Sequence, residues 1–248
     1  MSGNYFDLYQ HGLSIDCVAF GFHQNELKVL LQKPVNLDKW ALLGGFVKQD
    51  EDLETTANRV LLERAAVKDI KLHQFKVFSD PNRYDESYVN RLLSLDAISK
   101  DLEDWFLQRF ITIGYYALVE FSKVTPLPDA LSDQCEWISI HEIPEMIIDH
   151  DIILEQALKA LRKHLRIRPI GKGLLEEKFT MTELRTLYET ILGEELDRRN
   201  FQRKMLSFGI IEKLDEVRLG GAHKAPFLYR FNDEIYNQTL EKGFSTVW

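Results

Sequence analysis

The chain has 248 residues, of which 45% are apolar, so it can bury a substantial core in one large domain or two smaller ones. No run approaches the roughly 18 apolar residues of a membrane span. The N-terminus also lacks a basic segment followed by an apolar one. We therefore expect a cytoplasmic protein without a membrane partner.

Charge is distributed unevenly along the chain. The net charge of −8, taken alone, argues against a nucleic-acid partner. However, residues 1–165 contain 17 Lys and Arg against 26 Asp and Glu, or −9, whereas residues 198–230 contain 8 against 3, or +5. This asymmetry favours a two-domain regulator with one surface that faces DNA.

The N-terminal elements follow from apolar runs. Residues 13–22 and 27–31 predict two strands, and Cys17 within the first is expected to be a buried free thiol, as is Cys135. Residues 40–47, which follow these strands, predict a tight glycine turn into a helix. Acidic residues at 50–52 suit the start of that helix, because its unpaired N–H groups favour carboxylates.

Residues 45–67 resemble the Nudix box. The pattern is Gly, five residues, Glu, seven residues, then Arg-Glu, an apolar residue, any residue, Glu-Glu, any residue and Gly. The chain keeps four of its fixed positions: Gly45, Glu51, Arg59 and Glu63. It replaces three others, with Val60 and Arg64 where clustered glutamates belong and Ala66 where the second glycine belongs.

These replacements remove the chemistry of the box. Positions 60, 63 and 64 share one helix face, where three carboxylates could hold Mg²⁺. Val60 offers no oxygen and Arg64 carries a permanent positive charge. We therefore expect no catalytic residue, metal or cofactor. The alternative is an active hydrolase in which Glu63 and Glu51 bind Mg²⁺ with help from remote carboxylates such as Asp80 or Glu86.

Residues 84–109 predict an inserted amphipathic helix between a strand ending near Phe78 and another at 110–121. The helix either packs on the domain surface, or forms a lid over the pocket or a dimer contact. A turn at residues 80–83 lies beside it, so Arg83 is a candidate to face the pocket.

The second half reads as a separate module. A helix is expected at 151–165, and proline and glycines then indicate a linker at 166–178. Thr180 and Glu183 form a capping-box signature for a further helix that Gly193 ends. Asp197 caps the next helix, in which Phe201 and similar residues form an apolar side and Gly209 is a plausible C-terminal cap.

Two short helices, the second with a basic outer face, match a helix-turn-helix. We expect the DNA contacts of the second helix from Arg198, Arg199, Asn200, Gln202, Arg203 and Lys204. Residues 210–214 and 227–231 predict two strands that form a wing, whose tip would place His223 and Lys224 on phosphates.

Together, the two halves resemble the Nudix-related transcriptional regulators of the NrtR and arabinose-regulator (AraR) type. The resemblance implies an α+β fold, with a Nudix-like α/β/α sandwich and mixed sheet at 1–165 and a winged helix-turn-helix domain at 179–248. It also implies a homodimer that binds a double-stranded DNA operator. One departure lies at the wing tip, where the family often has Gly-Arg-Pro-Ala and this chain has His-Lys-Ala-Pro at 223–226.

Effectors in the family include ADP-ribose and L-arabinose. Val60 and the segment 40–47 are closer to the arabinose branch, and the acidic first domain disfavours a polyanion, so we expect a pentose, or else ADP-ribose. The residues expected to contact the effector are Trp40, Gly44, Gly45, Phe46, Glu63 and Arg83.

Overall fold

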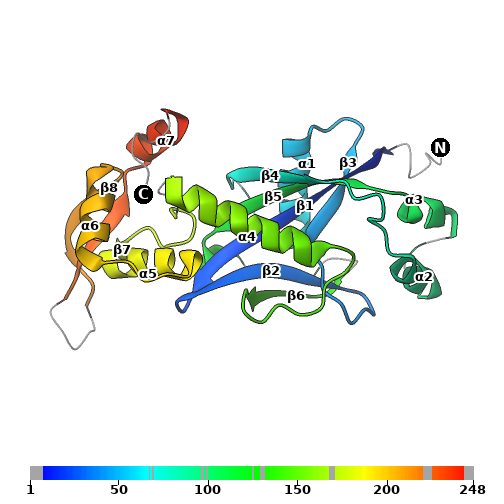
Figure 1. Cartoon of the computed structure of the whole chain (residues 1–248), viewed down its shortest axis with the longest axis horizontal. Helices are drawn as coiled ribbons and strands as arrows, with labels where there is room; N and C mark the ends of the chain where they lie inside the picture. Colours follow the sequence, from blue (N-terminus) through cyan, green and yellow to red (C-terminus); the bar gives the residue numbers. More distant parts are fainter. Residues whose placement is uncertain are drawn as a thin grey trace. The chain divides into compact units, whose positions relative to one another are not determined.

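The computed structural model contains two compact units (Figure 1). It describes residues 8–66, 68, 70–95, 98, 100–124, 126–128, 132–167, 171–219 and 225–242. The first unit comprises residues 1–21 and 28–159, and the second comprises residues 22–27 and 160–248. In the described part of the chain, no helix combines the length and apolar character that crossing a membrane demands.

A mixed six-stranded sheet forms the centre of the first unit, in the order β4-β5-β1-β2-β6 with β3 paired to β1. β1 runs parallel to β5 and antiparallel to β3, which is why the sheet is mixed. Its strands are β1 (Tyr9–His23), β2 (Glu26–Pro34), β3 (Leu43–Lys48), β4 (Leu72–Phe78), β5 (Ile111–Val119) and β6 (Ser132–Ser139).

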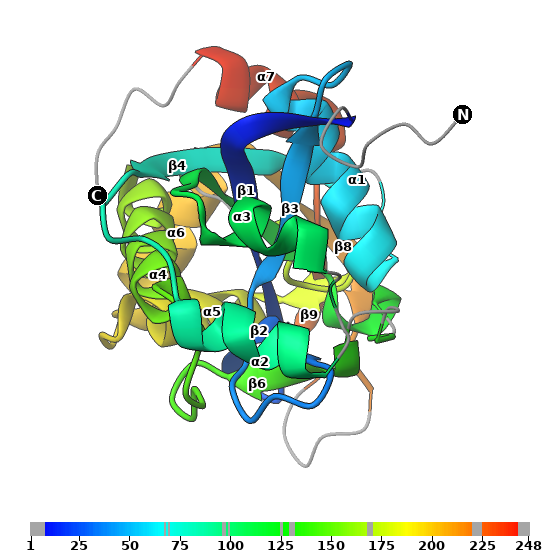
Figure 2. The ribbon, with the colours of Figure 1, turned by 90° about the vertical axis from the view of Figure 1, so that its right-hand side faces the viewer.

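Helices lie on both sides of this sheet. Figure 2 shows the strands between α1 and α4. The helices and 3₁₀ turns are α1 (Leu53–Ala65), α2 (Glu86–Ser94), η2 (Lys100–Leu102), α3 (Glu103–Leu107), η3 (Phe121–Lys123) and α4 (His150–Ile167). α4 extends into the predicted linker, and the predicted domain boundary at 165 stays a prediction.

Alternation along the strands explains the layers. Ile15, Cys17 and Ala19 of β1 are fully buried in one cluster with Val60 and Leu61 of α1. Because successive strand residues point to opposite faces, Val18 and Phe20 are buried on the other side of the sheet. Both cysteines are buried free thiols, as predicted.

The predicted single helix at 84–109 is wrong in detail. The segment forms α2, η2 and α3, which are short and separate. Asp85 is the N-cap of α2, and its side chain accepts a hydrogen bond from the N–H of Tyr88 at 3.0 Å. Apolar periodicity predicts helix here, but does not locate the break between two helices.

The second unit combines helices with a three-stranded sheet in the order β7-β9-β8. Its elements are β7 (Phe179–Thr180), α5 (Met181–Leu192), α6 (Arg198–Ser207), β8 (Ile211–Val217), β9 (Phe227–Phe231) and α7 (Asp233–Lys242). The antiparallel pair β8 and β9 is the predicted wing. α7 was not expected from the sequence.

Local signals place the two central helices. The capping box of α5 is complete: the Thr180 hydroxyl accepts from the N–H of Glu183 at 3.2 Å, and the Glu183 carboxylate accepts from the N–H of Thr180 at 2.6 Å. Gly193 ends α5 in the left-handed region, and Asp197 caps α6. The helices pack through Tyr188 and Phe201, whose ring centroids are 5.2 Å apart.

Candidate ligand pocket and nucleic-acid interface

A cavity of about 370 Å³ lies in the first unit. This volume falls within the range of small-molecule sites, roughly 300–1,000 Å³. Its walls come from β1, β2, β3 and α1, from the inserted segment and from the start of α4. Its charged side chains are Asp16, Arg59, Glu63, Arg64, Arg83 and Asp85.

Arg59 organises the retained part of the box. Its Nε donates to both carboxylate oxygens of Glu51 at 2.8 and 3.0 Å, and its Nη2 donates to the carbonyl of Phe46 at 2.9 Å. Its Nη1 donates to Glu63 at 3.1 Å. Hydrogen bonding from Arg59 lowers the pKa of Glu51 below its usual value. Both retained glutamates are therefore bound by a guanidinium.

Val60 belongs to the core as well as to the cavity wall. It is 1% exposed, and its Cγ2 atom lies only 2.5 Å from where a Cβ atom on Gly45 would stand. Gly44 is equally constrained, because an added Cβ would lie 2.6 Å from Oδ1 of Asp16. Both glycines pair within β3 against β1, so the predicted glycine turn is wrong. They permit close approach inside the sheet instead.

A buried ionic network forms one wall of the cavity. Arg83 donates from Nη2 to Asp16 at 2.9 Å and from Nε to Asp149 at 2.8 Å. His150 accepts from the N–H of Leu42 at Nδ1, 2.9 Å away, so its other nitrogen carries the proton and faces Asp16 at 3.6 Å. Burial lowers the pKa of His150, so this imidazole is neutral near pH 7.

The inserted segment lines the cavity with aromatic side chains. Tyr84 and Tyr88 come from the turn before α2 and from α2 itself, and Phe106 comes from α3. Burial raises the pKa of Tyr88, which keeps its hydroxyl protonated. Phe46 of β3 packs edge-on against Trp105 and Phe106, with centroid separations of 5.6 and 5.8 Å. The insertion is therefore part of the pocket wall.

Five of the six predicted effector residues line the cavity, namely Gly44, Gly45, Phe46, Glu63 and Arg83. The sixth, Trp40, is not among the lining residues. Trp40 instead forms a parallel bridge with Met146. Asp16 and His150 were missed, because they follow no motif and meet the box only through the pairing of β1 and the start of α4. Whether any of these residues binds a ligand remains a prediction.

The described residues do not fit a divalent cation site. Within these ranges, no group of three or more His, Cys, Asp and Glu side chains is arranged to hold a metal ion. Glu51 and Glu63, the carboxylates needed by the hydrolase alternative, are engaged by Arg59.

The second unit presents a basic helix face. Phe201 and Met205 of α6 are buried, whereas Arg199 and Arg203 are exposed, as the helical period predicts. Arg203 donates to Oδ1 of Asn200 at 2.9 Å. Arg198 is also exposed, and Gln202 and Lys204 are half-buried. The predicted wing-tip contacts, His223 and Lys224, lie outside the described residues.

Comparison with known families identifies two segments. The model described as "NUDIX domain" matches residues 10–160, and the model described as "NrtR DNA-binding winged helix domain" matches residues 171–231. A curated relative from Acinetobacter baylyi, named "ADPR responsive transcriptional repressor NtrR", is 29% identical over 232 residues. That similarity covers 91% of this chain and 84% of the relative.

Solved structures agree on the fold. NrtR of Shewanella oneidensis in complex with a 27mer DNA is 24% identical, with a TM-score of 0.69 over 91% of this chain and 95% of that one. A MutT/nudix family protein from Enterococcus faecalis is 20% identical, with a TM-score of 0.65 over 90% and 87%. At these identities the likeness supports the architecture alone.

Proposed function

The chain belongs to the NUDIX family as a Nudix-related, DNA-binding transcriptional regulator, and from this premise we propose that it is a homodimeric repressor whose effector is ADP-ribose. One observation carries the proposal: a cavity with three guanidinium side chains lies in the same chain as a winged helix with an exposed basic face. Those side chains are Arg59, Arg64 and Arg83. Guanidinium groups suit phosphate oxygens because they offer paired donors in one plane.

The predicted pentose effector finds no support among the relatives. The relative from Acinetobacter baylyi carries a name that refers to ADP-ribose. The preference for a sugar rested on Val60, on the segment 40–47 and, to a lesser extent, on the net charge of the first domain, −9 over residues 1–165. The cavity lining is less acidic than this sum, because it carries three arginines and three carboxylates, and charges within a few ångströms in a cavity are poorly screened. ADP-ribose therefore replaces the pentose in our proposal.

We propose further that the bound ligand is not hydrolysed. Val60 is buried in the core, and Arg59 engages both Glu51 and Glu63, which leaves no carboxylate cluster for Mg²⁺ among the described residues. A regulator that leaves its effector intact can respond to the effector's concentration. Mg²⁺-dependent turnover of ADP-ribose that Glu63→Gln abolished would contradict this part.

The test begins with selection of genomic fragments bound by the purified full-length protein. We expect one palindromic sequence to be enriched, and ADP-ribose, but not L-arabinose, to weaken binding to it in an electrophoretic mobility assay. Light scattering of the complex should give two protein chains for each operator. If no sequence is enriched, or if ADP-ribose leaves operator binding unchanged, the proposal is wrong.

A further inference from the structure

The pocket lies where the NUDIX family implies a divalent cation, and its residues do not fit one. Positions 60, 63 and 64 all line the cavity, as expected for one face of α1. Position 60 is an apolar side chain, position 63 is a glutamate bound by Arg59, and position 64 is an arginine. Together with Arg59, this face of α1 therefore presents one carboxylate, that of Glu63, and two guanidinium groups, those of Arg59 and Arg64.

We propose that Arg64 binds the diphosphate of the ligand directly, so that the pocket takes ADP-ribose without a divalent metal. This inference rests on the proposed function. Arg64 occupies a box position at which a carboxylate would bind the metal ion. The metal ion would in turn contact the phosphates. The guanidinium supplies positive charge at the same place, but fixed in the chain.

Electrostatics favours this exchange. A cation held by carboxylates compensates for phosphate charge, whereas a cation beside Arg64 would be repelled. A guanidinium forms two parallel hydrogen bonds with phosphate oxygens and remains charged at every physiological pH. The half-buried position of Arg64 strengthens such bonds, because water competes less there.

Arg64 shares the cavity with two other arginines. Arg59 pairs with Glu51 and Glu63, and Arg83 pairs with Asp16 and Asp149. Arg64 lies in the last turn of α1, and Gln32 anchors this turn by donating to its backbone carbonyl at 3.0 Å. This hydrogen bond to the backbone holds the end of α1 in place independently of what the Arg64 side chain contacts.

The experiment is calorimetric titration of the full-length protein with ADP-ribose and, separately, with adenosine, each in EDTA and in excess Mg²⁺. We expect the wild-type dissociation constant for ADP-ribose to agree within about twofold in the two buffers. Arg64→Ala should weaken ADP-ribose binding by roughly 10- to 100-fold, the scale of one or two charge-assisted hydrogen bonds. Adenosine, which lacks the diphosphate, should bind both proteins equally.

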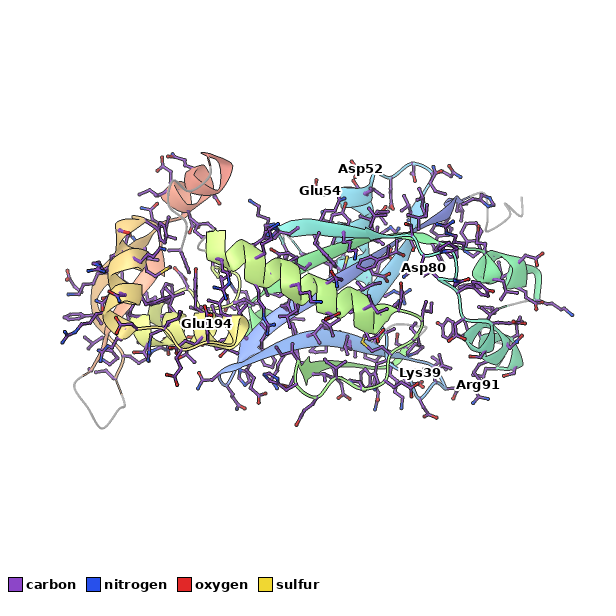
Figure 3. The ribbon with its side chains drawn as sticks, viewed as in Figure 1. Lys39, Asp52, Glu54, Asp80, Arg91 and Glu194 are labelled. Carbon is purple, nitrogen blue, oxygen red and sulfur yellow. The ribbon has the colours of Figure 1, made fainter. Side chains whose placement is uncertain are left out.

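Two further variants make the result specific. Arg64→Lys keeps the charge but not the paired donors, and should recover part of the affinity. Arg91→Ala removes the same charge from the exposed face of α2, outside the cavity lining (Figure 3), and should bind ADP-ribose like the wild type. Circular dichroism should give the same spectrum for all three variants.

The outcomes separate this inference from the proposed function. If the wild type binds ADP-ribose only with Mg²⁺, or if Arg64→Ala binds it as tightly as the wild type, the inference is overturned while the effector stands. Equal losses for ADP-ribose and adenosine would also overturn it, because the diphosphate would then not be the group recognised. If the wild type binds no ADP-ribose in either buffer, the proposed function fails first.

Discussion

Single residues of the altered box have consequences beyond lost catalysis. Ala66 is the C-cap of α1, with φ 53° and ψ 25°, where the box has glycine. The left-handed region costs an alanine about 1–2 kcal/mol, because its Cβ atom crowds the backbone. Glycine avoids this cost, which explains why the box has glycine at this position.

Ala66→Gly should therefore stabilise the protein. Glycine gains more freedom in the unfolded chain, which offsets part of the benefit, so we expect the free energy of unfolding to rise by about 0.5–1 kcal/mol. Urea denaturation measures this change. Ala65→Gly is the matched control: Ala65 is 1% exposed within α1, and its replacement should cost about 1 kcal/mol. A destabilising Ala66→Gly would show that the cap geometry is not left-handed in solution.

Part of the role of Val60 could be predicted from the sequence. Its apolar side chain predicted the loss of a metal ligand, and the structure adds its contact with Gly45. The sequence could not reveal this contact, because residues 45 and 60 meet only when α1 packs on β3. Arg59 pairs with Glu51, and this pair joins the middle of α1 to the segment that precedes the helix.

Secondary-structure elements were predicted well where local chemistry decides them. The capping box at Thr180 and the left-handed Gly193 fixed both ends of α5. Prediction was poorer where tertiary packing decides: Gly44 and Gly45 suggested a turn but lie in a strand, where they allow close contacts. The same limit hid Asp16 and His150, whose approach to Arg83 depends on strand and helix packing.

α6 is the element on which DNA recognition depends in our proposal. Arg199→Ala and Arg203→Ala should each weaken operator binding by about 1–3 kcal/mol, because both side chains are exposed opposite Phe201 and Met205. A phosphate contact would lower affinity for all sequences and reduce the salt dependence, whereas a base contact would relax specificity at one position.

Fluorescence anisotropy with operator and scrambled DNA at several salt concentrations distinguishes these cases. The control is Arg166→Ala, which removes an arginine that lies on α4 and pairs with Glu194 at 3.1 Å. Its operator affinity should match the wild type. Unchanged affinity in both α6 variants would show that this helix face does not enter the groove.

At the scale of the whole molecule, the N-terminal part of the chain is acidic and a segment of the C-terminal part is basic. Residues 1–165 carry a net −9, which reduces attraction to DNA outside the winged helix, while residues 198–230 carry +5. Local charge thus predicts that DNA binds the second unit, and this location stays a prediction. For the effector, the net charge of the first domain disfavoured a polyanion, whereas our proposal of ADP-ribose gives weight to the three arginines that line the cavity.

Effector and operator binding should be coupled reciprocally. If ADP-ribose weakens operator binding by some factor, saturating operator must weaken ADP-ribose binding by the same factor, because both ligands act on one equilibrium between two forms of the protein. Couplings of this kind are typically 5- to 150-fold. Titrating ADP-ribose into free protein and into the operator complex measures one factor, and titrating operator with and without ADP-ribose measures the other. L-arabinose should change neither. Equal ADP-ribose affinity in the two states would show that ligand binding does not regulate DNA binding, whatever its strength.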